Sequence, residues 1–191
     1  MEKLFRSLDN INIFKDTQKQ CKSDSYLMEA IKKADLMQEF ISEVKELEEI
    51  EKCKVYENTK IVVSKKRTLE AARDYKGKKV GVLNFADAIT PGGAVLYGAS
   101  TQEEAICRCS TLYENISKDA MLEVFYQPHK LLNVLYNDDI IYTPDVVVFK
   151  EDTSKANMLP KEEWYPVDVI TCAAPNLGAI TREKKKTDQC I

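Results

Sequence analysis

The hydrophobic and polar positions near the N-terminus follow a helical period. Apolar side chains recur every three or four positions between residues 27 and 50, at Leu27, Ile31, Ala34, Met37, Ile41, Val44, Leu47 and Ile50. This spacing places them on one face of a helix and the charged residues on the other. The pattern predicts one amphipathic helix over residues 27–50.

After residue 60 the pattern changes to short apolar runs between helical stretches. Strands are predicted where β-branched or apolar runs are bounded by glycine and proline, at residues 61–63, 79–85, 145–149 and 167–172. Helices are predicted at residues 68–75, capped by Thr68, and at 101–115 and 121–125. Residues 79–85 are a nearly continuous apolar sequence, as expected of a parallel strand that is buried on both faces. The alternation predicts an α/β fold with a largely parallel sheet and a helical N-terminal extension.

Composition narrows the class of protein. The chain has 191 residues with 44% hydrophobic content, enough for one domain with its own core. Its 28 basic and 31 acidic residues give a net charge of -3, which does not indicate the basic surface that binds duplex nucleic acid. No run approaches the roughly 18 apolar residues of a membrane span, and the N-terminus lacks the apolar core of a signal peptide. We therefore expect a cytoplasmic or nuclear protein without membrane contact.

Cysteine and histidine offer no metal site. The six cysteines show no C-x-x-C spacing, and His129 is the single histidine. Cys107 and Cys109 lie two apart in a predicted helix and face different directions. Free thiols and no bound metal are expected.

The loop at residues 84–94 is the candidate ligand site. It follows the predicted strand 79–85, and in open α/β sheets ligands bind beyond the carboxyl ends of strands. Gly92 and Gly93 have no Cβ, so their backbone can approach a phosphate or sugar closely, and a helix starting near Thr101 adds its positive dipole. A Pro-Gly-Gly sequence can equally well just reverse the chain.

Two adjacent carboxylates, Glu103 and Glu104, fall in the first turn of that helix beside the glycine loop. Thr101 and Glu104 also have the spacing of a capping box, in which Thr101 accepts from the helix backbone and Glu104 reaches back to cap it. Acidic residues favour helix N-termini in any case. The spacing therefore leaves two hypotheses, a functional carboxylate pair and a structural cap.

The sequence Pro91-Gly92-Gly93-Ala94, followed after seven residues by Gln102-Glu103-Glu104, resembles the GGG-x(6–8)-QEE signature of poly(ADP-ribose) glycohydrolases. The flanking stretches at 82–86 and 107–113 are similar to the microbial-type branch of that family, and the likeness extends from about residue 14 to residue 177.

This resemblance implies a macrodomain-like mixed sheet flanked by helices, with residues 1–54 as a helical extension and residues 55–191 as a partial catalytic region. It implies that ADP-ribose and poly(ADP-ribose) on modified proteins are the ligands, and that no cofactor is needed. Glu104 matches the catalytic glutamate, which acts first as general acid and then as general base. Glu103 matches the neighbour that hydrogen-bonds the ribose. The remaining matched ligand-binding positions are Asn84, Phe85, Ala86, Asp87, Gly92, Gly93, Ala94 and Gln102.

The chain also departs from the family pattern. Ala94 replaces the third loop glycine, where its methyl group could crowd the ligand or restrict φ. The carboxylate of Asp87 would repel a diphosphate unless it accepts a ribose hydroxyl. Nothing after residue 177 resembles the family's next helix, strand and second glycine-rich loop, so an incomplete C-terminal part and weak or absent activity are expected. The alternatives are a non-catalytic ADP-ribose-binding module and a structural remnant without a ligand.

The surroundings of three other side chains are predicted from the neighbouring sequence. His129 follows Pro128 at a predicted turn and is expected at the surface. Trp164 is expected to pack in the core rather than stack on adenine. Arg108 either forms a salt bridge that orients Glu104 or the loop, or is solvated.

Overall fold

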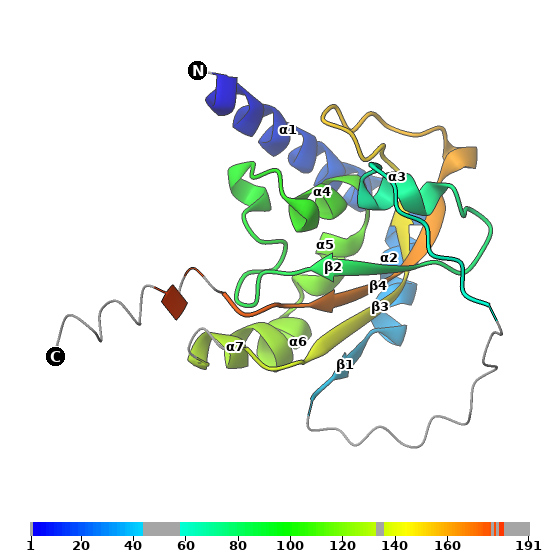
Figure 1. The fold of residues 1–191 in the computed structure, drawn as a ribbon. Helices are drawn as coiled ribbons and strands as arrows, with labels where there is room; N and C mark the ends of the chain where they lie inside the picture. The colour runs from blue at the N-terminus through cyan, green and yellow to red at the C-terminus, as the bar shows by residue number, and fades with distance from the viewer. Residues whose placement is uncertain (1, 44–57, 133–135, 177, 179, 182–191) are drawn as a thin grey trace, which may run out of the picture.

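The N-terminal region forms two consecutive helices and a short strand. The computed structural model describes residues 2–43, 58–132, 136–176, 178 and 180–181. Helix α1 (Glu2–Ser23) is followed by α2 (Ser25–Met37), which Asp24 caps by accepting from the N–H of Tyr26 and of Leu27 at 3.0 and 3.2 Å. Helix α1 packs against η1 (Val95–Tyr97) and α4 (Gln102–Cys109), so the extension contacts the elements around the glycine loop (Figure 1).

The single helix predicted over residues 27–50 is wrong. The helix ends at Met37, Gln38 adopts extended backbone, and strand β1 (Glu39–Ile41) pairs antiparallel with β3. Pairing with another strand overrides the local helical period, because it satisfies the backbone of residues 39–41 and packs Phe40 on a buried cluster. Residues 44–50, and the predicted boundary at residues 54 and 55, lie outside the described residues.

The described strands form a mixed sheet in the order β1-β3-β4-β2, where β2 is Gly81–Phe85, β3 is Ile140–Val148 and β4 is Tyr165–Cys172. Strands β2 and β4 are parallel, whereas β3 pairs antiparallel with both β4 and β1. The predicted mixed α/β sheet is confirmed, and the largely parallel pairing is wrong. The described chain between β3 and β4 contains only the short η3 (Lys161–Glu163) and no crossover helix, so β4 returns in the opposite direction.

The helices after β2 are shorter and more broken than predicted. The stretch 101–115 divides into α4 (Gln102–Cys109) and α5 (Leu112–Ile116), because Ser110 has extended backbone and bridges to Val148. The predicted helix 121–125 is part of a longer run of α6 (Asp119–Met121), the π-helical η2 (Leu122–Tyr126) and α7 (Gln127–Leu131).

Before β2, helix α3 (Thr68–Arg73) forms as predicted, but Arg67 rather than Thr68 is its N-cap. The predicted strand at 61–63 does not form, and Ile61 and Val63 are exposed.

Strand β2 is covered by helices on one face only. Helices α2 and α5 pack on β3, and α3 and α4 pack on β2 (Figure 1). Val82 and Asn84 point into this covered side, whereas Leu83 and Phe85 on the other side are 46% and 66% exposed. The prediction that this strand is buried on both faces is therefore wrong, because β2 lies at the end of the described sheet.

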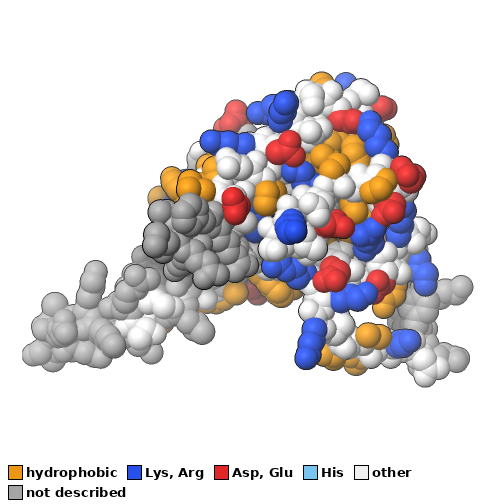
Figure 2. All heavy atoms as spheres, turned by 90° about the horizontal axis from the view of Figure 1, so that it is seen from above, with side chains coloured by type: hydrophobic (Ala, Val, Ile, Leu, Met, Phe, Trp, Pro, Cys, Tyr) orange, Lys and Arg blue, Asp and Glu red, His pale blue; other side chains and the backbone are white. Residues whose placement is uncertain are grey.

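Charge is distributed evenly over the face that Figure 2 presents. Acidic and basic side chains alternate there, as expected for a chain of net charge -3. None of the helices in the described part of the chain is long and apolar enough to span a membrane.

Candidate active site

Asp87 shapes the first half of the loop that follows β2. Its carboxylate accepts the backbone N–H of Ile89 and of Thr90 at 2.9 and 2.8 Å, which closes an Asx turn just beyond the strand. The negative charge of Asp87 is thus already engaged by its own loop.

The second half of the loop depends on two glycines in the left-handed region. Gly92 and Gly93 have φ values of +67° and +57°. A Cβ on Gly93 would lie 2.7 Å from Oε1 of Glu104 and 3.0 Å from Oε2 of Glu103. Only glycine therefore lets the loop backbone pass this close to both carboxylates. Ala94 has a φ of -98°, which a residue with a Cβ adopts readily, so this position of the loop does not need glycine.

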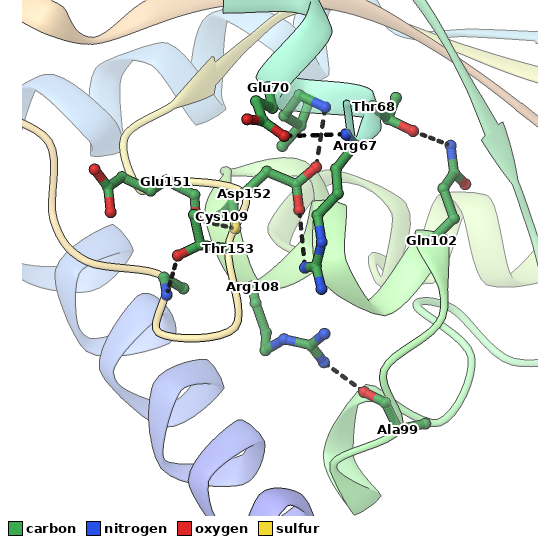
Figure 3. A network of polar contacts seen from close by, with 12 residues as sticks. Arg67, Thr68, Glu70, Ala99, Gln102, Arg108, Cys109, Glu151, Asp152 and Thr153 are labelled. Carbon is green, nitrogen blue, oxygen red and sulfur yellow. Dashed lines mark hydrogen bonds and ion pairs between the residues drawn. The ribbon is translucent and has the colours of Figure 1, made fainter. Parts of the chain in front are cut away.

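Gln102, at the start of α4, fixes the helix to the strand. Its Oε1 accepts the N–H of Phe85 at 2.9 Å, and its Nε2 donates to the carbonyl of Leu83 at 2.7 Å. The same Nε2 donates to Oγ1 of Thr68 on α3 at 3.2 Å (Figure 3). This side chain joins β2, α3 and α4, and so sets where the next two residues point.

Glu103 is buried between the strand end and the loop. Its Oε2 accepts the N–H of Asp87 at 2.8 Å, and its Oε1 accepts from Nδ2 of Asn84 at 3.3 Å. Burial, assisted by the negative charges of Glu104 and Asp87 and opposed by the two hydrogen bonds, raises the pKa of Glu103 to about 7. A carboxyl with this pKa carries a proton part of the time at neutral pH.

Glu104 is also buried, and it points at the glycine loop. Its Oε1 accepts the N–H of Ala94 at 3.0 Å, and its Oε2 accepts from the hydroxyl of Thr101. Thr101 makes no side-chain hydrogen bond to the helix backbone, so the capping-box geometry is not formed. The carboxylate holds the loop instead of capping the helix.

Arg108 fastens the far end of the loop. It is buried, and its Nη1 donates to the carbonyl of Ala99 at 2.5 Å (Figure 3). The solvated alternative is wrong, and the loop is held through a backbone carbonyl rather than through a salt bridge to Glu104. Nearby, buried Asp152 accepts the N–H of Leu69 at 3.0 Å and pairs with Arg67, which anchors the start of α3 (Figure 3).

The predictions for His129 and Trp164 have different outcomes. His129 is buried, with Nδ1 2.7 Å from the carbonyl of Phe125, so the surface prediction is wrong; α7 turns this face towards the cluster around Phe125. Trp164 packs beside Phe149 and donates to the carbonyl of Leu159 at 2.9 Å, which confirms core packing.

Among the described residues, no cysteine forms a disulfide and no cluster of metal ligands is present. Among the described cysteines, Cys21, Cys107, Cys109 and Cys172 are free. Within the described residues no group of three or more His, Cys, Asp or Glu side chains could hold a metal. Cys53 and Cys190 lie outside the described residues.

One contact of the site comes from a part of the chain that the motif does not include. Thr171 on β4 accepts from Nδ2 of Asn84 at 3.3 Å, and Asn84 also donates to Glu103. No local pattern indicates this role, because it depends on the pairing of β2 with β4.

Comparison with known proteins finds a matching family and several similar structures. Residues 8–151 match the family described as microbial-type PARG, catalytic domain. The poly(ADP-ribose) glycohydrolase of Thermomonospora curvata bound to the inhibitor ADP-HPD is 30% identical, with a TM-score of 0.71 over 90% of this chain and 64% of that chain. A second structure of that protein gives 29% identity and a TM-score of 0.73, over 90% of this chain and 66% of that one.

The Deinococcus radiodurans glycohydrolase in complex with ADP-ribose is 34% identical, with a TM-score of 0.54 over 64% of this chain and 47% of that one. The chain thus spans less than two thirds of the length of these relatives. A search of curated proteins gives no match.

Proposed function

Because the chain belongs to the microbial-type poly(ADP-ribose) glycohydrolase family, whose catalytic domain its residues 8–151 match, we propose that it hydrolyses ribose–ribose bonds in poly(ADP-ribose). In this proposal the loop at 84–94 and the start of α4 bind ADP-ribose, and Glu104 is the catalytic acid and base. The related structures that contain ADP-HPD and ADP-ribose support the class of ligand.

The proposal depends on one observation, namely that two buried carboxylates lie against the backbone of Gly93. Glu103 and Glu104 are 3% and 5% exposed, and both approach Gly93 too closely for any side chain there. Carboxylates are rarely buried unless they are paired, because desolvating their charge is costly. A loop of this kind brings donor N–H groups and carboxylates to one point, as glycoside hydrolysis on an anionic substrate needs.

The reaction then follows from the two roles of one carboxyl. Glu104, protonated, donates its proton to the oxygen of the departing ribose as the bond from that oxygen to the anomeric carbon breaks. The anomeric carbon becomes oxocarbenium-like, and a water forms the new C–O bond while Glu104 takes up the water's proton. Glu104 ends protonated again, and both products are neutral at the cleaved bond. Glu103 holds a ribose hydroxyl and the N–H of Asp87.

The decisive experiment changes this carboxyl to an amide. Glu104→Gln should lower the release of ADP-ribose from polymer by roughly 100-fold or more, the usual cost of removing a general acid and base. Its affinity for ADP-ribose, measured by calorimetry, should stay within a few-fold of wild type. The exposed Glu29→Gln is the matched control and should change neither quantity. Wild-type turnover in Glu104→Gln would contradict the assignment.

A non-catalytic ADP-ribose-binding module is the second candidate. It is supported by one observation, namely that both oxygens of Glu104 already accept hydrogen bonds, one from the N–H of Ala94 and the other from the hydroxyl of Thr101. Binding of ADP-ribose without any release from polymer over long incubation at high protein concentration would select this candidate.

A further inference from the structure

Helix α1 presents a largely polar set of side chains to the rest of the protein. Four residues spaced three, four and three positions apart lie on one face of this helix, namely Ser7, Asn10, Phe14 and Thr17. Asn10, Phe14 and Thr17 are buried. Apolar side chains would be enough to cover a hydrophobic core, so the buried polar groups of this face indicate specific hydrogen bonds to what lies beneath it.

The first two polar side chains of this face bind the chain just after the glycine loop. Nδ2 of Asn10 donates to the carbonyl of Gly98 at 2.9 Å, and the hydroxyl of Ser7 donates to the carbonyl of Tyr97 at 2.7 Å. A Cβ on Gly98 would overlap the carbonyl of Ser7, so the helix and the loop are in contact through their backbones as well. Helix α1 therefore fixes the place of residues 97–98.

Backbone hydrogen bonds connect residues 97–98 with the carboxylate of Glu104. The N–H groups of Tyr97 and Ala99 donate to the carbonyl of Ala94 at 3.0 and 3.2 Å. The N–H of Ala94 in turn donates to Oε1 of Glu104 at 3.0 Å. Ala94 thus lies between the segment that α1 holds and the carboxylate that is proposed as acid and base.

A second connection from α1 to the glycine loop runs through two aromatic rings. Buried Phe14 packs edge-on to Tyr113 of α5, with ring centroids 4.9 Å apart. The ring of Tyr113 lies so close to Gly92 that a Cβ there would be 2.8 Å from Cδ2 of the tyrosine. Helix α1 therefore supports the loop on both sides of Ala94, at Gly92 through the rings and at Gly98 through Asn10.

The middle of α1 is anchored to other parts of the protein. The hydroxyl of Thr17 donates to the carbonyl of Arg108 at the end of α4 at 2.5 Å. Buried Lys150 donates to the carbonyl of Ile13 at 3.1 Å and to the hydroxyl oxygen of Thr17 at 2.9 Å, and it pairs with Asp16 at 2.8 Å. These contacts fix the helix on α4 and on the residue after β3, so it can hold the loop in one place.

We propose that α1 is the support of the glycine loop and that Asn10 is a positioning residue for the proposed active site. The amide of Asn10 sets the place of residues 97–98, and through them the position of the Ala94 N–H that holds Glu104. Loss of this contact leaves every ligand-binding side chain present but lets the loop and the carboxylate move apart. The inference rests on the proposed function only in taking Glu104 as the catalytic acid and base.

Hydrogen exchange of the ligand-free protein, followed by NMR, tests the support of the loop. Asn10→Ala removes the donor to Gly98. The amide protons of Ala94, Tyr97 and Ala99 should then exchange faster by roughly 3- to 10-fold, because one buried hydrogen bond typically contributes about that factor to a local opening equilibrium. Amide protons of β4 serve as the internal reference for any change in global stability.

Cys21→Ala is the matched control. Cys21 is a buried residue of the same helix, but it packs with Val147 and Phe149 in a cluster that contains no loop residue. Both substitutions should lower the melting temperature, and only Asn10→Ala should speed the loop amides more than those of β4. Ser7→Ala removes the other loop contact and gives the same test with a milder change. Loop amides that exchange no faster in Asn10→Ala and Ser7→Ala than in Cys21→Ala overturn the inference.

Turnover then tests the positioning role, at a temperature well below the melting temperature of each variant. At saturating polymer, Asn10→Ala should release ADP-ribose about 10-fold more slowly than wild type, because a displacement of about 1 Å can cost on the order of 100-fold in rate. Cys21→Ala should keep the wild-type rate. A wild-type rate in Asn10→Ala overturns the positioning role. If wild type neither binds ADP-ribose nor releases it from polymer, the proposed function fails, and hydrogen exchange still decides whether α1 supports the loop.

Discussion

Glu103 connects the chemistry of the site with the stability of the protein. Its pKa is about 7 in the folded protein, above the usual value of 4.5, so the folded state binds more protons than the unfolded state between these pH values. Stability should therefore fall as pH rises from about 4.5 to 7, by an amount on the order of 3 kcal/mol.

Glu103→Gln should remove this slope. Melting temperatures measured from pH 4.5 to 7.5 should converge between the variant and wild type at low pH, and the variant should be the more stable at high pH. A difference between the two that is constant with pH would contradict the raised pKa.

Gly93 is the residue at which loop backbone and carboxylates come closest. Gly93→Ala places a Cβ 2.7 Å from Oε1 of Glu104 on a residue with a left-handed φ. The substitution should lower the free energy of unfolding by more than the roughly 1 kcal/mol expected from the left-handed φ alone. Gly77→Ala is the matched control, because Gly77 has a φ of +85° and nothing within 4 Å of the added atom. Urea denaturation should show the larger loss for Gly93→Ala, and calorimetry should show weakened ADP-ribose binding only in that variant. Equal losses would show that the carboxylates can move aside.

Among the elements, α3 holds the start of α4 through Gln102 and Thr68, and Asp152 in turn holds α3. Asp152→Ala should leave the N–H of Leu69 without its partner and destabilise the protein by about 1–3 kcal/mol in urea denaturation. Asp74→Ala is the control, because the ion pair of Asp74 with Lys66 is solvent-exposed and should be worth less than about 1 kcal/mol. If both substitutions cost the same, the cap on α3 contributes nothing.

For the molecule as a whole, one face of β2 is uncovered at the end of the described sheet, where Leu83 and Phe85 are exposed, and the chain spans 64% of a related glycohydrolase. We expect a polypeptide of residues 1–191 alone to release ADP-ribose from polymer slowly, because the part of the relative outside the match can help to position the substrate, and misplacing a substrate by about 1 Å can cost on the order of 100-fold in rate.

Extension with the C-terminal third of the Thermomonospora curvata relative should restore turnover. The same extension on Glu104→Gln is the control and should remain inactive. Equal turnover by the 191-residue chain and by its extended form would show that the added segment is dispensable.

Much of the site could be read from the order of residues along the chain. The loop after an apolar strand, two glycines and two glutamates at the next helix start are local features, and the structure brings all of them together. The spacing of Thr101 and Glu104 could not distinguish a cap from a functional carboxylate, because the partners of Glu104 depend on how the loop folds back.

The sequence determined the family, the α/β class and the position of the carboxylate pair, because these rest on motifs and on short-range periodicity. Tertiary structure alone decided that the helix from Ser25 stops at Met37, since β1 pairs with β3 about 100 residues later. It also decided that β2 has an exposed side, that His129 is buried, and that Asn84 donates to both Glu103 and Thr171. These outcomes depend on contacts between residues far apart in the chain, and a local sequence pattern does not show which distant residues a segment will contact.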